Sequence, residues 1–130
     1  MTGEAPISRR GRWKRVGERI YLCGTLGSEF DAWQRRLAAV SAADAFESQQ
    51  LGLAEVEKLM DSLETEARES LAEGESLSPR KSPGYADMPL SFSATIIREL
   101  DATRSLGVSM TASGLLVPSK TVTAVCEITK

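Results

Sequence analysis

The chain of 130 residues contains no histidine, only two cysteines and few aromatic side chains, which make up 5% of the total. Histidine is the commonest metal ligand, the usual base beside serine nucleophiles, and the side chain whose ordinary pKa lies nearest neutrality. Its absence argues against hydrolases and metalloenzymes generally. No apolar run in the sequence approaches the roughly 20 residues that a membrane-spanning helix needs.

The remaining composition is that of one small globular domain, with 42% hydrophobic residues and a formal net charge of −2. The N-terminus is basic but lacks the apolar core of a secretory signal, which predicts a cytoplasmic protein. Cys23 and Cys126 lie far apart, both in strand-like runs. A buried, reduced pair is the favoured interpretation, and a disulfide or redox pair is the alternative.

Basic side chains are concentrated near the N-terminus. They are Arg9, Arg10, Arg12, Lys14, Arg15 and Arg19. We expect residues 1–18 to form a basic, flexible segment, either a solvated tail or the edge of a first strand. A contact with nucleic acid or an acidic partner is a weaker alternative, because no aromatic ladder or nucleic-acid motif accompanies the charges.

Residues 19–130 are predicted to form a single α+β domain, with about three helices on an antiparallel β-sheet. A strand is expected at 19–26, and a capping box at Ser28 is expected to open the first helix. Apolar side chains recur at helical spacing in this helix, and Trp33 among them is interpreted as a core residue rather than a group that stacks on a cofactor.

A second box, at Ser41, predicts a longer helix that runs to about Leu71, with Gly52 as a point where it kinks or breaks. Its charge-rich stretch, 55–73, is interpreted as solvated helix surface. Ser91 or Ser93 is expected to cap a third helix that ends at Gly107. Paired strands are then predicted at 108–112 and 121–128, with a turn at 118–120 between them.

The most informative stretch is the loop from Pro79 to Leu90. Its three prolines exclude a helix. Arg80 offers a planar fork that pairs with a carboxylate, Gly84 allows a close backbone approach, and Tyr85 adds a flat apolar face with a polar tip. On these residues alone, we interpret the loop as a candidate site for a small zwitterion.

The same stretch carries a family resemblance. Arg80-Lys81-Ser82-Pro83-Gly84-Tyr85 resembles the Arg-x-x-x-Gly-Tyr motif by which the reactivation domain of cobalamin-dependent methionine synthase binds S-adenosylmethionine. Residues 82–91 resemble the longer signature of that domain's short stand-alone relatives. The runs 106–113 and 118–124 resemble its closing strands, and Gly24-Thr25-Leu26-Gly27 resembles its Ala-Thr-Leu-Gly element. The resemblance covers roughly residues 21–128.

The resemblance implies an activation-domain-like fold over 19–130 and a set of ligand-binding residues. Arg80 would pair with the carboxylate of S-adenosylmethionine, Gly84 would allow close backbone approach, and Tyr85 would contact the ligand with its ring or hydroxyl. Ser82 and Pro83 would contribute backbone. The alternative is that Arg80 is a surface cation, Gly84 a turn residue and Tyr85 a packing residue.

The implied function is that of an accessory component of methionine synthase, a methyltransferase of methionine biosynthesis, rather than a complete enzyme. S-adenosylmethionine would remethylate cobalamin reductively, with an electron from flavodoxin or another reductant. The chain has no Asp-x-His-x-x-Gly element, so a separate methionine synthase or corrinoid protein would hold the cobalamin. A different class of function is a non-catalytic interaction module that caps or stabilises a corrinoid protein without binding S-adenosylmethionine.

The sequence departs from the family pattern in three places. Thr111-Ala112-Ser113 stands where the family has Thr-Glu-Ser, which removes a carboxylate. We find no counterpart of an acidic ligand contact that precedes the first strand in the family. The family also continues with an aromatic-rich segment past the position of Lys130. Ligand affinity is therefore expected to be weaker than in the family, or to be completed by a partner chain.

Overall fold

The computed structural model describes residues 4–85 and 87–130. It contains a four-stranded antiparallel sheet of order β1-β2-β6-β3 and a separate small hairpin, β4-β5. The strands are β1 (Arg10–Val16), β2 (Arg19–Thr25), β3 (Ser76–Leu77), β4 (Ser109–Met110), β5 (Leu116–Val117) and β6 (Thr121–Thr129). The helices are α1 (Ser28–Val40), α2 (Ala42–Glu69), α3 (Phe92–Leu100) and α4 (Ala102–Leu106). The α+β class and the antiparallel sheet are confirmed, with four helices where about three were expected.

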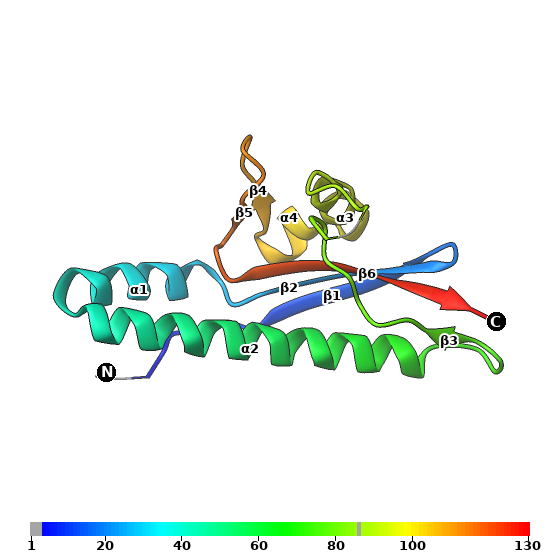
Figure 1. The fold of residues 1–130 in the computed structure, drawn as a ribbon, viewed down its shortest axis with the longest axis horizontal. Coiled ribbons are helices and arrows are strands. Elements are labelled where there is room, and N and C mark those ends of the chain that lie inside the picture. The colour runs from blue at the N-terminus through cyan, green and yellow to red at the C-terminus, as the bar shows by residue number, and fades with distance from the viewer. Residues whose placement is uncertain (1–3, 86) are drawn as a thin grey trace.

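The two faces of the sheet are covered by different helices (Figure 1). The long helix α2 packs across one face, and α3 with α4 packs on the other. Successive side chains of β2 therefore enter two separate cores, because side chains alternate along a strand. Ile20 and Leu22 face α2, whereas Tyr21 and Cys23 face α3. Burial on both faces explains why this strand reads as a continuous apolar run.

A third cluster joins α1 to α2. Phe30, Trp33 and Leu37 of α1 are buried with Val56 of α2, which confirms Trp33 as a core residue. The cysteines are both free and buried, as expected, and lie in opposite cores. Burial raises the pKa of the Cys23 thiol to about 12 and that of Cys126 to about 11. Both side chains are therefore thiols at neutral pH and behave as small apolar residues.

The expectation of a flexible basic segment needs a correction. Arg10–Val16 forms β1, which pairs along its whole length with β2 through a two-residue turn at Gly17 and Glu18. The alternative, that these residues form the edge of a first strand, is the one the structure supports. The sequence did not distinguish this strand from a solvated tail, because its side chains are mostly charged. An edge strand tolerates such residues, since one of its sides faces solvent.

The helix termini agree with the predictions in part. Ser41 caps α2, because its side chain accepts a hydrogen bond from the Asp44 amide at 3.2 Å. The predicted cap at Ser28 is wrong: Gly27 is the N-cap of α1 and no side chain caps it. The α2 helix also runs without a break through Gly52. A Cβ there would lie 2.8 Å from both the Phe30 ring and Lys120 Cε, so glycine lets these groups pack against the helix.

The third helix begins at Phe92, and neither Ser91 nor Ser93 caps it. Ser93 is buried and shares a hydrogen bond of 2.9 Å with Thr123, which ties α3 to β6. Asp101, at φ 51°, separates α3 from α4, and Gly107 ends α4 at φ 72°, as predicted for that glycine.

The predicted pairing of the strands at 108–112 and 121–128 is wrong. The first of them is the short β4, which pairs with β5, whereas β6 pairs with β2 and β3. Residues 118–120 thus connect β5 to β6 rather than turning between paired strands. Among the residues described, no helix is long and apolar enough to cross a membrane.

Candidate functional site

The loop that carries the motif is anchored to the edge of β6 that faces away from β2. The Ser78 amide donates to the Glu127 carbonyl at 2.9 Å, and the Ser78 hydroxyl accepts from the Glu127 amide at 2.8 Å. Three residues further on, Lys81 and Val125 exchange both backbone hydrogen bonds, at 2.9 and 2.8 Å. Arg80 lies between these anchors, so its backbone position is fixed by the sheet.

The next residues form a tight turn. The Ser82 carbonyl accepts a hydrogen bond from the Tyr85 amide at 3.3 Å, with buried Pro83 second and Gly84 third in the turn. Gly84 has φ 98°, as a type II turn requires of its third residue. Its amide donates to the Met88 carbonyl at 2.9 Å, which closes the loop. The positive φ explains why glycine stands at this position, and the expected absence of helix in this loop is confirmed. Ala86 lies outside the described residues.

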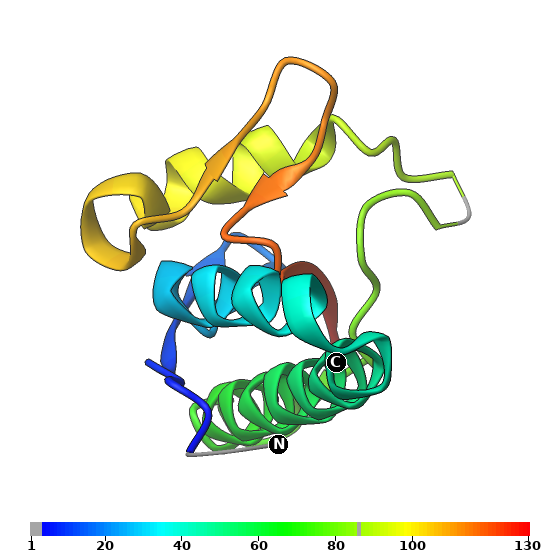
Figure 2. The same ribbon diagram turned by 90° about the vertical axis from the view of Figure 1, so that its left-hand side faces the viewer.

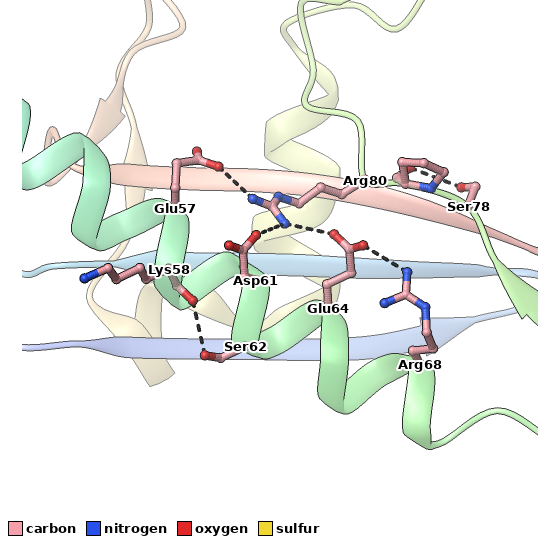
Figure 3. A network of polar contacts seen from close by, with 9 residues as sticks. Glu57, Lys58, Asp61, Ser62, Glu64, Arg68, Ser78 and Arg80 are labelled. Carbon is pink, nitrogen blue, oxygen red and sulfur yellow. Dashed lines mark hydrogen bonds and ion pairs between the residues drawn. The ribbon is translucent and has the colours of Figure 1, made fainter.

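The Arg80 guanidinium is held by three carboxylates of α2 (Figure 3). Its Nη1 donates to Asp61 at 2.8 Å and to Glu64 at 2.9 Å, and its Nη2 donates to Glu57 at 2.6 Å. These acids are four and three residues apart, which places them on one face of the helix. Glu64 also accepts from Arg68 at 3.0 Å.

The network fixes both the charge and the orientation of Arg80. Burial alone would lower the pKa of the guanidinium, but hydrogen bonds to Asp61, Glu57 and Glu64 raise it above its ordinary value. An arginine has five N–H donors. Within the described part of the chain, three are used, which leaves the Nε–H and one Nη2–H of Arg80 without a partner. These two donors remain for the carboxylate of a ligand.

A hollow of about 460 Å³ lies beside this guanidinium. It is lined by Glu57, Glu64, Pro79, Arg80, Lys81, Ser82 and Tyr85. The Tyr85 side chain stands largely in solvent, with 73% of the residue exposed. A second hollow of about 260 Å³ lies on the other side of Lys81 and Tyr85, toward Phe92 and Val125.

The structure therefore brings together three of the five predicted site residues. Arg80, Ser82 and Tyr85 line one hollow, whereas Pro83 and Gly84 form the turn that holds Tyr85 at its rim. Sequence reasoning missed the three acids of α2, which it interpreted as solvated surface. Their helical spacing was visible in the sequence, but the loop that lies over them was not.

The departure at Ala112 lies in the hairpin that approaches the motif loop. Ala112 occupies the tip between β4 and β5. The Leu90 side chain lies against both Gly84 of the loop and Gly114 of the hairpin, within 3.4 and 3.3 Å of where their Cβ atoms would be. The described residues contain no group of three or more acidic or cysteine side chains arranged to hold a metal ion.

Comparisons with known proteins show a likeness to a solved structure. Neither a scan against protein-family models nor a search of curated proteins found a match. Among solved structures, a crystal structure of the MetH reactivation domain bound to AdoHcy matches with a TM-score of 0.53 and 20% sequence identity. The match covers 84% of this chain and 38% of the solved chain. The chain therefore has the fold of the MetH reactivation domain and spans well under half of the length of that solved chain.

Proposed function

We propose that the chain binds S-adenosylmethionine at the motif loop and serves as a reactivation module for cobalamin that a separate methionine synthase or corrinoid protein holds. The observation that carries the proposal is the state of Arg80. Its guanidinium is fixed by α2, yet keeps two N–H donors beside a hollow. The likeness to a domain solved with AdoHcy supports it, because AdoHcy is S-adenosylmethionine without the transferable methyl group.

The groups around the hollow suit the three charges of S-adenosylmethionine. The carboxylate of the ligand would take the free donors of Arg80. Its ammonium would lie near Glu57 or Glu64, which line the same hollow. The exposed Tyr85 ring offers a π-face to the sulfonium or to the adenine. The residues present thus fit the ligand without any acid–base group.

The chemistry of remethylation is supplied by S-adenosylmethionine and by the partner's cobalamin, with an electron from flavodoxin or another reductant. The sulfonium is already an activated methyl donor, so the chain needs to bind and orient it rather than to move a proton. This division of labour explains how a chain without histidine takes part in a methyl transfer.

The strong ion pairing of Arg80 also favours a second candidate function. Three carboxylates already hold this guanidinium, which is what a purely structural strut between loop and helix would show. In that case the domain is a non-catalytic module that caps or stabilises a corrinoid protein. The two functions differ in whether S-adenosylmethionine binds at the loop.

An NMR titration of the purified chain with S-adenosylmethionine distinguishes them. The proposed function predicts saturable shifts of the amide resonances of Lys81, Gly84 and Tyr85, with β1 unchanged at the other edge of the sheet. Shifts spread evenly over charged surface residues would indicate nonspecific attraction and count against the site. An unchanged spectrum would support the non-catalytic module.

Charge predicts a preference between the two adenosyl compounds. With Arg68 on Glu64, the network has two guanidiniums and three carboxylates, so its charge is +2 − 3 = −1. S-adenosylmethionine carries a net positive charge and AdoHcy none. We expect the former to bind roughly two- to fivefold more tightly at low salt, with the difference shrinking as salt screens it. The measurement is the ratio of the two Kd values across ionic strength.

A pair of neutralising variants checks the origin of that preference. Glu57→Gln with Asp61→Asn should reduce it, because both carboxylates belong to the network. Glu66→Gln with Glu69→Gln changes the net charge equally on exposed residues of the same helix and should leave it intact. An equal loss in both pairs would assign the preference to overall charge.

The isolated chain is expected to bind no cobalamin through an axial nitrogen of histidine, because it has none. Absorption spectra of purified protein mixed with cobalamin should match those of free cobalamin. A spectrum with a new axial nitrogen ligand would mean that the chain holds the corrinoid itself, and the proposed division of labour would be wrong.

A further inference from the structure

The outer edge of β1 carries backbone groups that the fold leaves unpaired. Val16 and Arg19 flank a two-residue turn, so they form a hydrogen-bonded pair, and such pairs recur at every second residue. The same alternation directs the N–H and C=O groups of Lys14, Arg12 and Arg10 toward β2. The hydrogen bonds between Lys81 and Val125 agree with this alternation. They direct the backbone groups of Val125 away from β2, so Tyr21, which lies opposite Val125 in β2, must direct its own backbone groups toward β1.

The intervening residues of β1 direct their backbone groups the other way. These are Gly11, Trp13 and Arg15, and in the described residues their N–H and C=O groups have no backbone partner on that side. The sheet order places this edge opposite β3 and the motif loop. Figure 2 shows the same separation, with the blue N-terminal strand region on one side and the yellow-green loop on the other. The edge is therefore distinct from the proposed ligand site.

The charge along this edge is strongly positive. Four of the seven residues of β1 are basic. Arg15 is paired with Glu75 at 2.9 Å, and Lys14 approaches Glu99 only to 3.9 Å. Arg10 and Arg12 are exposed and have no ion-pair partner within residues 4–85 and 87–130. They share a face of the strand with Lys14, so three cations line one side of the free edge.

This charge pattern disfavours a second copy of the chain as the occupant. In an antiparallel pair centred on Trp13, Arg12 of one copy would face Lys14 of the other, and like charges directly opposite each other destabilise a sheet. An extended segment with acidic residues at alternate positions would instead place carboxylates opposite these cations. Backbone hydrogen bonds to Gly11 and Trp13 would provide the affinity.

We propose that β1 accepts an acidic, extended segment of a partner protein as an additional strand of the sheet. This interaction goes beyond the proposed function and does not depend on it, since the loop and this edge lie on opposite sides. A chain that failed to bind S-adenosylmethionine would still bind such a segment. Native edge strands often carry charge to prevent association, and here the same charge would select for an acidic partner.

The test uses an acetylated and amidated peptide of alternating glutamate and valine, as long as β1. Hydrogen exchange of the full chain is followed by NMR with and without it. We expect the amides of Gly11, Trp13 and Arg15 to exchange about tenfold more slowly in the complex, because they gain partners. Binding without slower exchange at these amides would overturn the proposal. So would the absence of binding at millimolar peptide.

Two control peptides separate strand pairing from charge attraction. Replacing each glutamate by glutamine should weaken binding about tenfold or more, since it removes the carboxylates that face the cations. N-methylation of the residues that donate to β1 preserves the charge but removes the hydrogen bonds, and should abolish the protection. Equal binding by either control would contradict an acidic added strand.

Protein variants and two competing occupants complete the test. Arg12→Glu with Lys14→Glu should weaken peptide binding about tenfold or more, whereas Arg35→Glu with Arg36→Glu, an equal charge change on the exposed face of α1, should not. If the first pair fails to fold, the glutamine peptide still decides the question. Single-stranded DNA that protects the three amides as well as the peptide, or a dimer formed through β1 in sedimentation, would overturn the proposal.

Discussion

Arg80→Ala is expected to weaken S-adenosylmethionine binding by roughly ten- to a hundredfold, because a charged, bidentate hydrogen-bonding partner contributes on the order of 1.5–3 kcal/mol. Arg80→Lys should fail in a similar way, since lysine has no planar fork and cannot both hold the α2 carboxylates and offer two further donors. Calorimetric Kd values for parent and variants measure the effect. An Arg80→Ala protein that binds as tightly as the parent would remove Arg80 from the site.

The loss of Arg80 also leaves three carboxylates close together, so stability needs a control. Arg80→Ala combined with Glu57→Gln and Asp61→Asn relieves that repulsion while still lacking the guanidinium. If the loop remains ordered in this triple variant and its affinity stays well below that of the Glu57→Gln, Asp61→Asn pair with Arg80 intact, Arg80 contacts the ligand. Recovery of parental affinity would instead show that Arg80 acts only by neutralising α2.

Gly84→Val is expected to reduce S-adenosylmethionine affinity about tenfold or more while leaving the thermal midpoint nearly unchanged. Gly84 has φ 98°, a conformation that costs a β-branched residue about 1–3 kcal/mol, so the turn should rearrange and displace Tyr85. Crowding adds little, because a Cβ at this position would meet only Leu90, at 3.4 Å. Gly84 is exposed and belongs to none of the three cores, so unfolding should change less than binding.

Gly74→Val is the matched control for backbone strain. Gly74 is also exposed, at φ 87°, in the turn between α2 and β3, and no atom lies within 4 Å of where its Cβ would be. It should change stability by a similar small amount and leave affinity intact. If Gly84→Val lowers the midpoint and the affinity together, Gly84 is a structural turn residue. Unchanged affinity would leave the ligand site dependent on Arg80 alone.

Much of the fold follows from local sequence signals. The box at Ser41 begins a helix whose buried face repeats at helical spacing, and Gly107 ends the last one in the conformation that glycine favours. The strand at 19–26 was recognised from its apolar run and the strand at 121–128 from its alternating apolar side chains, and β2 and β6 lie there. These features depend on neighbours in the sequence, so a single chain is sufficient to predict them.

The errors arise where distant segments decide the structure. β1 tolerates basic residues because one of its edges pairs with no other strand. Its pairing with β2 makes it a strand although its composition is typical of a solvated segment. The pairing of β6 with β2 rather than with the strand at 109–110 depends on contacts about 100 residues apart in the sequence, which no local pattern encodes. Gly52 fails to break α2 because the side chains of Phe30 and Lys120 pack where a Cβ would lie.

In the candidate site, too, local features were predicted and contacts between distant segments were not. The sequence predicted the loop and its turn at Gly84, because prolines and glycine determine local backbone shape. It did not predict that Glu57, Asp61 and Glu64 would hold Arg80, since that contact requires knowing which face of α2 lies under the loop. The acids change the electrostatics of the site from cationic to net acidic.

Isothermal titration of the purified chain with S-adenosylmethionine tests the central claim most directly. The account predicts saturable binding of one ligand per chain, tighter for S-adenosylmethionine than for AdoHcy at low salt and strongly reduced in Arg80→Ala. Absence of binding at millimolar ligand, in protein whose far-ultraviolet spectrum and cooperative melting show it to be folded, would contradict the claim and leave the non-catalytic module as the function to pursue.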